Sequence, residues 1–264
     1  MIRVGHYNYT GSDDFSGDAV GGCNVKNLHI LNDSATKTNT FGLDLHASVY
    51  AEYRNLHLDG CRNGFVVQVV SGWLSIKDLL IDGTGLAYGA RVYGEGFSSD
   101  YNSTGLDFSG ITAINFTVAG FSCEGNAFGD INVGQLVLYG GDAGAIGVLL
   151  NSTGDKHYAN KIQIHGIEMD GTAAYALYSD GVSQLQVMGL TSGGAIAAPW
   201  YITGGTNNII ISNHGILMSG QAVSDPAAPE AGHGILYLRD NGAGKKQFVA
   251  RFPSGAVQAI ATEP

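Results

Sequence analysis

Asn24–Ile30 reads NVKNLHI, and Glu52–Leu58 repeats this pattern as EYRNLHL. Each copy has an apolar residue, a polar pair, and then two apolar residues that alternate with a polar one. Alternation with period two is typical of a half-buried β-strand, and the polar pair indicates a tight corner between two short strands. Further copies are LSIKDLLI from Leu74, INVGQLVL from Ile131, IQIHGIEM from Ile162, LQVMGLTS from Leu185 and IIISNHGILM from Ile209.

A third strand, opened by Gly, Ala or Pro, follows most copies after a turn. These strands are GLDLHAS from Gly42, GFVVQVV from Gly64, GARVYGE from Gly89, GFSCEGN from Gly120, GVLLNST from Gly147, AYALYSD from Ala174 and PWYITGG from Pro199. Their starts are 22 residues (Gly42 to Gly64) to 31 residues (Gly89 to Gly120) apart. Three strands in a repeat of this length form one turn of a parallel β-helix, whose coils stack to bury their apolar faces. We therefore expect an all-β fold, a single-stranded parallel β-helix of about eight coils.

Strand alternation assigns the faces of these third strands. The second and fourth positions are apolar and are expected to point inward, with Cys123 as a core thiol. The third position forms a first outward column: Asp44, Val66, Arg91, Ser122, Leu149, Ala176 and Tyr201. The fifth position forms a second outward column: His46, Gln68, Tyr93, Glu124, Asn151, Tyr178 and Thr203. The second column is polar and aromatic without one chemical type, which favours a contact surface over an architectural role.

Composition excludes several classes of function. The formal net charge of the 264 residues is −10 and no basic stripe is present, so a nucleic-acid partner is not expected. No apolar run has the length of a membrane span, and the N-terminus lacks the apolar core of a signal peptide. The three cysteines are too far apart for a zinc motif or a disulfide framework. We expect no metal site and no cofactor.

The C-terminal part differs from the repeat. Asp225–Pro229 reads DPAAP, which is typical of a linker and separates a β-helix over residues 1–222 from a segment over residues 223–264. Within that segment, residues 235–239, 247–252 and 256–261 have strand character and are joined by glycine-containing turns. We expect a small antiparallel β-meander that caps the last coil or holds subunits together.

The coil pattern over roughly residues 20–220 resembles the pectate-lyase-like right-handed β-helix superfamily, and within it the phage tailspike and tail-fibre depolymerases. The terminal RFPSGAVQAIATEP is similar to short tails of phage-type β-helix proteins. The resemblance implies a right-handed helix, a homotrimer, and location in a virion tail or outside the cell. It also implies binding or cleavage of a bacterial surface polysaccharide. No catalytic motif of the family can be placed on this sequence.

Catalytic candidates are therefore sought among the outward residues. Glycoside hydrolysis needs two carboxyl groups, and Glu124 lies one coil from Glu95, at an expected diagonal of about 8 Å, inside the ~6.5–9.5 Å window for inversion. Uronate β-elimination would need a cation for the substrate carboxylate, and Arg91 is the one Lys or Arg in the outward columns. The structural alternative for Arg91 is an ion pair with Glu124, without a role in substrate binding. We therefore favour a hydrolase over a lyase.

Sugar contact is expected along the same surface. Aromatic rings pack on the apolar faces of sugars, and neighbouring polar groups bind the hydroxyls. The binding candidates are Arg91, Tyr93, Tyr178, Tyr201, Gln68, Asn151 and His46. Shielding of the sheet or an intersubunit contact is the alternative for the tyrosines. The prediction is a tailspike-like polysaccharide depolymerase; the alternative function is a non-catalytic glycan-binding or structural fibre module.

His29 and His57 are expected to be architectural or solvated, because later coils have Leu80 and Val137 in their place.

Overall fold

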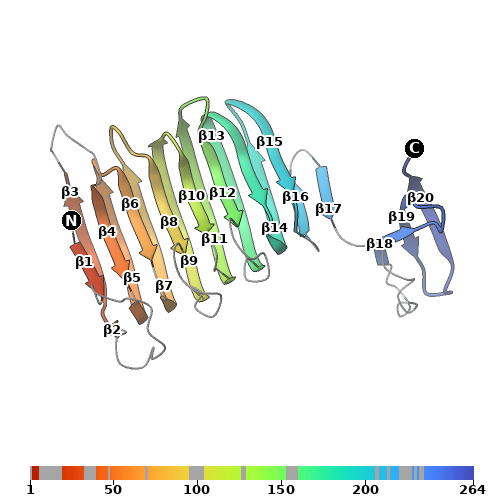
Figure 1. Ribbon diagram of the computed structural model, residues 1–264, viewed down its shortest axis with the longest axis horizontal. Helices are drawn as coiled ribbons and strands as arrows, with labels where there is room; N and C mark the ends of the chain where they lie inside the picture. The colour runs from red at the N-terminus through yellow and green to blue at the C-terminus, as the bar shows by residue number, and fades with distance from the viewer. Residues whose placement is uncertain are drawn as a thin grey trace.

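The computed structural model describes residues 2–5, 20–32, 40–46, 48–68, 71–94, 104–125, 129–152, 160–205, 208–212, 215–219, 228, 231 and 235–264. These residues form an all-β structure, a parallel β-solenoid with a separate antiparallel sheet at the C-terminus (Figure 1). The fold class predicted from the sequence is confirmed. None of the described segments forms a helix that is long and apolar enough to cross a membrane.

Two parallel ladders build the solenoid. Ladder A consists of β1 (Ile2–Gly5), β4 (Phe41–His46), β6 (Asn63–Gln68), β8 (Tyr88–Gly94), β10 (Ala119–Gly125), β12 (Ile146–Ser152), residues 172–180 of β13 (Asn160–Asp180) and β15 (Ala195–Thr203). Ladder B consists of β2 (Val20–Gly21), β3 (Val25–Leu31), β5 (Ser48–Asp59), β7 (Gly72–Asp82), β9 (Thr104–Phe116), β11 (Gly129–Gly141), residues 160–170 of β13, β14 (Ser183–Ser192) and β16 (Asn208–Ser212). The solenoid has about six turns, fewer than the eight coils expected.

Left-handed residues bend the strands of ladder B. Asn55 and Asp78 have φ angles of 53° and 55°, and they occupy the predicted polar corner in successive coils. Asparagine and aspartate tolerate this conformation better than most residues do. A second corner column was not predicted and contains Tyr50, Trp73, Gly105, Asp130, Lys161 and Gln184. The corners give each coil its separate faces and aim the alternate side chains into one core.

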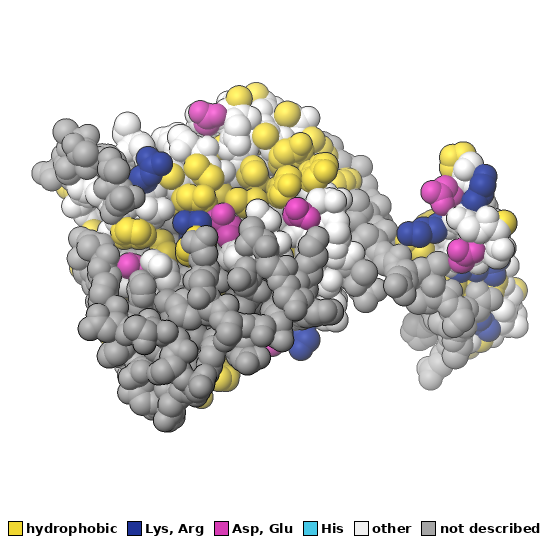
Figure 2. All heavy atoms as spheres, in the orientation of Figure 1, with side chains coloured by type: hydrophobic (Ala, Val, Ile, Leu, Met, Phe, Trp, Pro, Cys, Tyr) yellow, Lys and Arg dark blue, Asp and Glu magenta, His cyan; other side chains and the backbone are white. Residues whose placement is uncertain are grey.

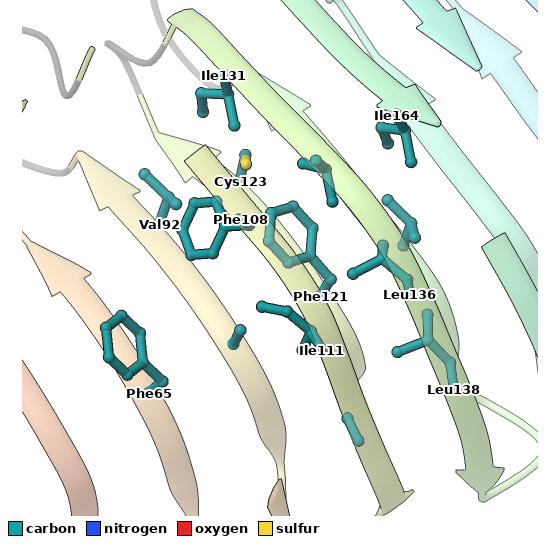
Figure 3. Packing of buried hydrophobic residues seen from close by; sticks show 14 of the residues in the cluster. Phe65, Val92, Phe108, Ile111, Phe121, Cys123, Ile131, Leu136, Leu138 and Ile164 are labelled. Carbon is teal, nitrogen blue, oxygen red and sulfur yellow. The ribbon is translucent and has the colours of Figure 1, made fainter. Parts of the chain in front are cut away.

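The core lies between the ladders and is almost entirely apolar. Phe108 of β9 and Phe121 of β10 meet edge to face, with ring centroids 5.2 Å apart (Figure 3). Cys123 is fully buried beside them, as predicted, and burial raises the pKa of its thiol well above the usual range, with the Glu124 carboxylate adding to the shift. A thiol held neutral in this way is a packing group and not a nucleophile. Leu56 and Leu58 point inward and His57 outward, also as predicted.

The expected register is wrong at β13. The structure pairs Leu177 with Val148 and Asp180 with Asn151, so the small residue in the glycine column is Ala176 and not Ala174. The expected alignment is thus displaced by two residues in this coil. Tyr178 consequently leaves the second outward column and joins the first, next to Tyr201. Asp180 takes the place in the second column that was assigned to Tyr178.

The last expected copy of the repeat, from Ile209, is also wrong. β16 is followed by β17 (Gly215–Ser219), which pairs with it in the antiparallel direction, Ile210 opposite Leu217. This hairpin covers the edge of β16. The expected C-terminal meander is present as β18 (Ile235–Asp240), β19 (Lys246–Arg251) and β20 (Val257–Thr262), and within the described residues it shares no ladder with the solenoid. Most of the expected linker lies outside the described residues.

Candidate functional site

The outward side of ladder A carries most of the candidate residues. With the register corrected, the first outward column is Asp44, Val66, Arg91, Ser122, Leu149, Tyr178 and Tyr201. The second outward column is His46, Gln68, Tyr93, Glu124, Asn151, Asp180 and Thr203. Figure 2 shows hydrophobic side chains gathered over the middle of the solenoid, with isolated acidic and basic side chains beside them.

An ion pair lies at the centre of this surface. The Arg91 Nε atom donates to Oε1 of Glu124 at 2.9 Å, and the side chains are only 20% and 15% exposed. The Ser122 hydroxyl donates to the same oxygen at 2.9 Å. The guanidinium also lies over the rings of Tyr88 and Tyr93, at 4.2 and 4.0 Å from their centroids. The Arg91–Glu124 ion pair is therefore confirmed, and these contacts hold Glu124 in one orientation.

Tyr88 was not among the expected site residues. Partial burial, and secondly the nearby Glu124 carboxylate, raise the pKa of Tyr88, so its hydroxyl stays protonated and can donate a hydrogen bond. Tyr88 lies three positions before Arg91, at the start of β8, so period-two alternation places the two side chains on opposite faces and does not predict their contact. The guanidinium is thus enclosed by two aromatic rings and one carboxylate.

A tyrosine cluster occupies the later coils. The Tyr178 and Tyr201 rings stack with centroids 5.1 Å apart and planes 17° apart, and Tyr175 lies 5.7 Å from both. Tyr201 is 44% exposed. Desolvation, followed by the Asp180 carboxylate, raises the pKa of Tyr178. The cluster is therefore a row of packed aromatic side chains, of which Tyr201 is the exposed member.

The polar candidates are distributed along the second outward column. Gln68 donates from Nε2 to Oδ1 of Asp44 at 2.7 Å, and Asp44 is 1% exposed. Asn151 is half-buried between the coils of Glu124 and Asp180. The side chain of His46 and the whole of Glu95 lie outside the described residues, so the expected Glu95–Glu124 pair stays a prediction.

The corrected register offers a second carboxylate for Glu124. Asp180 lies two coils away in the same column, with Asn151 between them. Two inter-strand steps of ~4.8 Å place their backbones about 10 Å apart. The side chains can close part of this distance. The separation is then compatible with the ~6.5–9.5 Å found between the carboxyl groups of inverting glycosidases.

One group of side chains among the described residues could hold a metal ion. His29, His57 and Asp59, on the outward side of ladder B, place ligand atoms within 4.8 Å of one another. Linear metal-binding motifs do not reveal this group, because His29 comes next to His57 and Asp59 only through the pairing of β3 with β5.

No protein-family model, curated protein or solved structure matches the chain. Any assignment of function therefore depends on the geometry and chemistry of these surfaces.

Proposed function

We propose that the protein binds a bacterial surface polysaccharide along the outward side of ladder A. The observation that carries this proposal is the stacked pair of Tyr178 and Tyr201, with Tyr175 beside them, next to the polar second column. Aromatic faces pack on the C–H faces of sugar rings, while amides and carboxylates bind hydroxyl groups. Both kinds of group occur here on adjacent strands.

The spacing of these groups suits a polymer. From Gln68 to Thr203 the second column crosses five inter-strand steps, which corresponds to about 24 Å at ~4.8 Å a step. A single monosaccharide would contact only a small part of this column. We therefore infer a glycan chain that lies along the solenoid axis.

The charges favour a neutral or weakly charged glycan. The chain has a net charge of −10, which repels strongly anionic polymers. Arg91, the cation of the outward columns, is already paired with Glu124. Uronate elimination, which needs a cation free to bind the substrate carboxylate, is thus the less favoured reaction.

Hydrolysis of the bound glycan is the second candidate function, and the position of Asp180 favours it. Glu124, held by Arg91 and Ser122, would activate the water, and Asp180 would donate a proton to the leaving oxygen. Glu95, the partner predicted from the sequence, would serve the same role from the preceding coil. The protein would then be a depolymerase; without a working pair it would be a glycan-binding or structural fibre module.

The tailspike resemblance adds two further proposals. It favours assembly as a homotrimer, and it favours a place in a virion tail or outside the cell. The solenoid fold supports the resemblance at the level of architecture.

Glycan binding is tested by probing the protein against an array of bacterial polysaccharides. Replacement of Tyr178 and Tyr201 by alanine is expected to reduce affinity for any bound glycan by at least tenfold, because the aromatic faces on which the sugar rings pack are removed. Tyr139→Ala is the matched control, since Tyr139 is exposed but lies on ladder B. Equal binding by the double variant and the control would refute the assignment of this surface.

Cleavage is tested separately by the release of reducing ends. Glu124→Gln is expected to abolish release while binding on the array persists. Asp180→Asn then identifies the second carboxylate: loss of cleavage supports Asp180, and full cleavage shifts the role to Glu95. Absence of cleavage by the parent on every glycan that it binds would establish the non-catalytic alternative.

A further inference from the structure

Two histidines are stacked on neighbouring coils of ladder B. His29 of β3 and His57 of β5 are register partners, and their rings lie 4.2 Å apart with planes at 5°. His57 Nε2 is 3.1 Å from Oδ1 of Asp82 on β7. This contact leaves Nδ1 of His57 for another partner. The next coil has Leu80 in the same column, so stacking of the coils does not require histidine.

Two carboxylates flank the histidines. Asp59 and Asp82 are register partners, so two negative charges lie on neighbouring strands at the same level. Like charges placed directly opposite one another destabilise a sheet. Within the described part of the chain, no lysine or arginine pairs with either of them. A cation bound beside them would remove this repulsion.

We propose that His29, His57 and Asp59 bind a divalent transition-metal ion such as Zn²⁺, Ni²⁺ or Co²⁺. Their ligand atoms already lie within 4.8 Å of one another. Two imidazoles and one carboxylate select transition metals over Ca²⁺ and Mg²⁺, which prefer oxygen ligands alone. Asp82 is the positioning residue, because a ligating histidine usually gives its other ring N–H to a carboxylate.

The ligands are free to take up the required geometry. Parallel stacked rings direct their lone pairs side by side, so the imidazoles must splay to converge on one ion. His29 is exposed and His57 is one-third exposed, so neither ring is locked by core packing. An open groove of about 320 Å³ lies against both rings and leaves room for water to complete the coordination shell.

Metal binding would link the first coils of ladder B. Within the described residues, β3 pairs only with β5, whereas β5 also pairs with β7. A metal ion held from β3 and β5 therefore links an outer strand to the next coil. The ion would stabilise the folded state by RT ln(1 + c/Kd), where c is the ion concentration, so the free energy of unfolding would rise with the logarithm of the ion concentration above Kd.

The test uses the full chain, without a histidine tag and after treatment with a chelator. Isothermal titration with Zn²⁺ and Ni²⁺ is expected to show one site with a Kd on the order of micromolar, and Co²⁺ should give visible absorption of nitrogen-ligated cobalt. His29→Ala and His57→Ala are each expected to weaken this site at least tenfold. Asp82→Asn should weaken it ~10-fold or more as an outer partner of His57.

The matched control is His165→Ala, because His165 is exposed on the same ladder and bonds to Asn132. It should bind metal like the parent. Melting temperatures in chelator check that every variant is folded, and added Zn²⁺ should raise the melting temperature of the parent and the control alone. The proposal would be overturned if the parent bound no metal at an ion concentration ~100-fold above the expected Kd of ~1 μM. Unchanged binding by the His29→Ala, His57→Ala double variant would also overturn it.

Discussion

At the scale of single residues, a buried tyrosine makes the fold sensitive to alkali. Tyr53 is fully buried and its hydroxyl lies 3.0 Å from the Ser48 hydroxyl. Burial, partly offset by that hydrogen bond, raises the pKa of Tyr53 to about 12 from its usual value of 10.0. The unfolded chain releases this proton first, so stability is complete below pH 10 and falls as the pH rises towards 12.

We expect Tyr53→Phe to lose about 1 kcal/mol at pH 8, through the missing hydrogen bond, yet to lose less additional stability at high pH than the parent does. A rise of the Tyr53 pKa from 10.0 to about 12 corresponds to roughly 2 kcal/mol of stability lost by the parent between pH 8 and pH 11.5. Urea unfolding at pH 8 and pH 11.5 measures the difference. Tyr139→Phe, at an exposed site, should follow the parent at both values. A Tyr53→Phe curve parallel to that of the parent would show that Tyr53 does not titrate in this range.

At the scale of strands, stacked glycines determine how closely the coils approach. A Cβ atom built on Gly89 would lie 2.2 Å from the carbonyl oxygen of Gly120 and 2.7 Å from Cβ of Ala113. The first of these atoms belongs to the backbone of the next coil and cannot move without disturbing the ladder. Gly89→Ala is therefore expected to destabilise the protein by about 2–3 kcal/mol.

Thermal unfolding followed by circular dichroism measures this effect. Gly144→Ala is the control, because a Cβ atom there would come no closer than 3.4 Å to a side-chain oxygen in an exposed turn. The control should melt within a degree or two of the parent. Equal melting temperatures for the two variants would show that the coils can separate to admit a methyl group.

The same glycine column explains where prediction from the sequence succeeded and failed. Period-two alternation identified the strands, and Gly42, Gly64, Gly89, Gly120 and Gly147 gave the correct register through five coils. In the sixth coil, Ala174 and Ala176 are both small and two residues apart. A slip of two keeps every side chain on its expected face, so alternation cannot distinguish them. Only the pairing of β12 with β13 places Ala176 against Gly147.

The candidate sites were predicted less completely than the fold. Arg91, Tyr93 and Glu124 were expected together, because they lie in coils whose register was correct. The slip in the sixth coil separated Tyr178 from Tyr201 and kept Asp180 out of the second outward column. The absence of histidine from later coils led to the expectation that His29 and His57 are architectural or solvated. It did not address a local role that depends on neighbouring strands.

At the scale of the whole molecule, the C-terminal sheet offers a means of assembly. β18, β19 and β20 form a three-stranded sheet, which is close to the smallest size that is stable by itself. Leu236, Phe252 and Ile260 of this segment are 54%, 43% and 55% exposed. Apolar side chains concentrated on so small a unit favour contact with other copies of the chain.

We therefore expect replacement of Leu236 and Ile260 by aspartate to dissociate the proposed homotrimer. In light scattering after size exclusion, the parent should have a mass of 82.5 kDa, three times 27.5 kDa, and the variant a mass of 27.5 kDa. Met188→Asp, which places the same charge at an exposed apolar site on β14, should leave the trimer intact. A monomeric parent would refute the trimer itself, whereas a trimeric double variant would move the subunit contact to the solenoid. Circular dichroism of the variant should keep its β-sheet spectrum, because the solenoid core contains neither substituted residue.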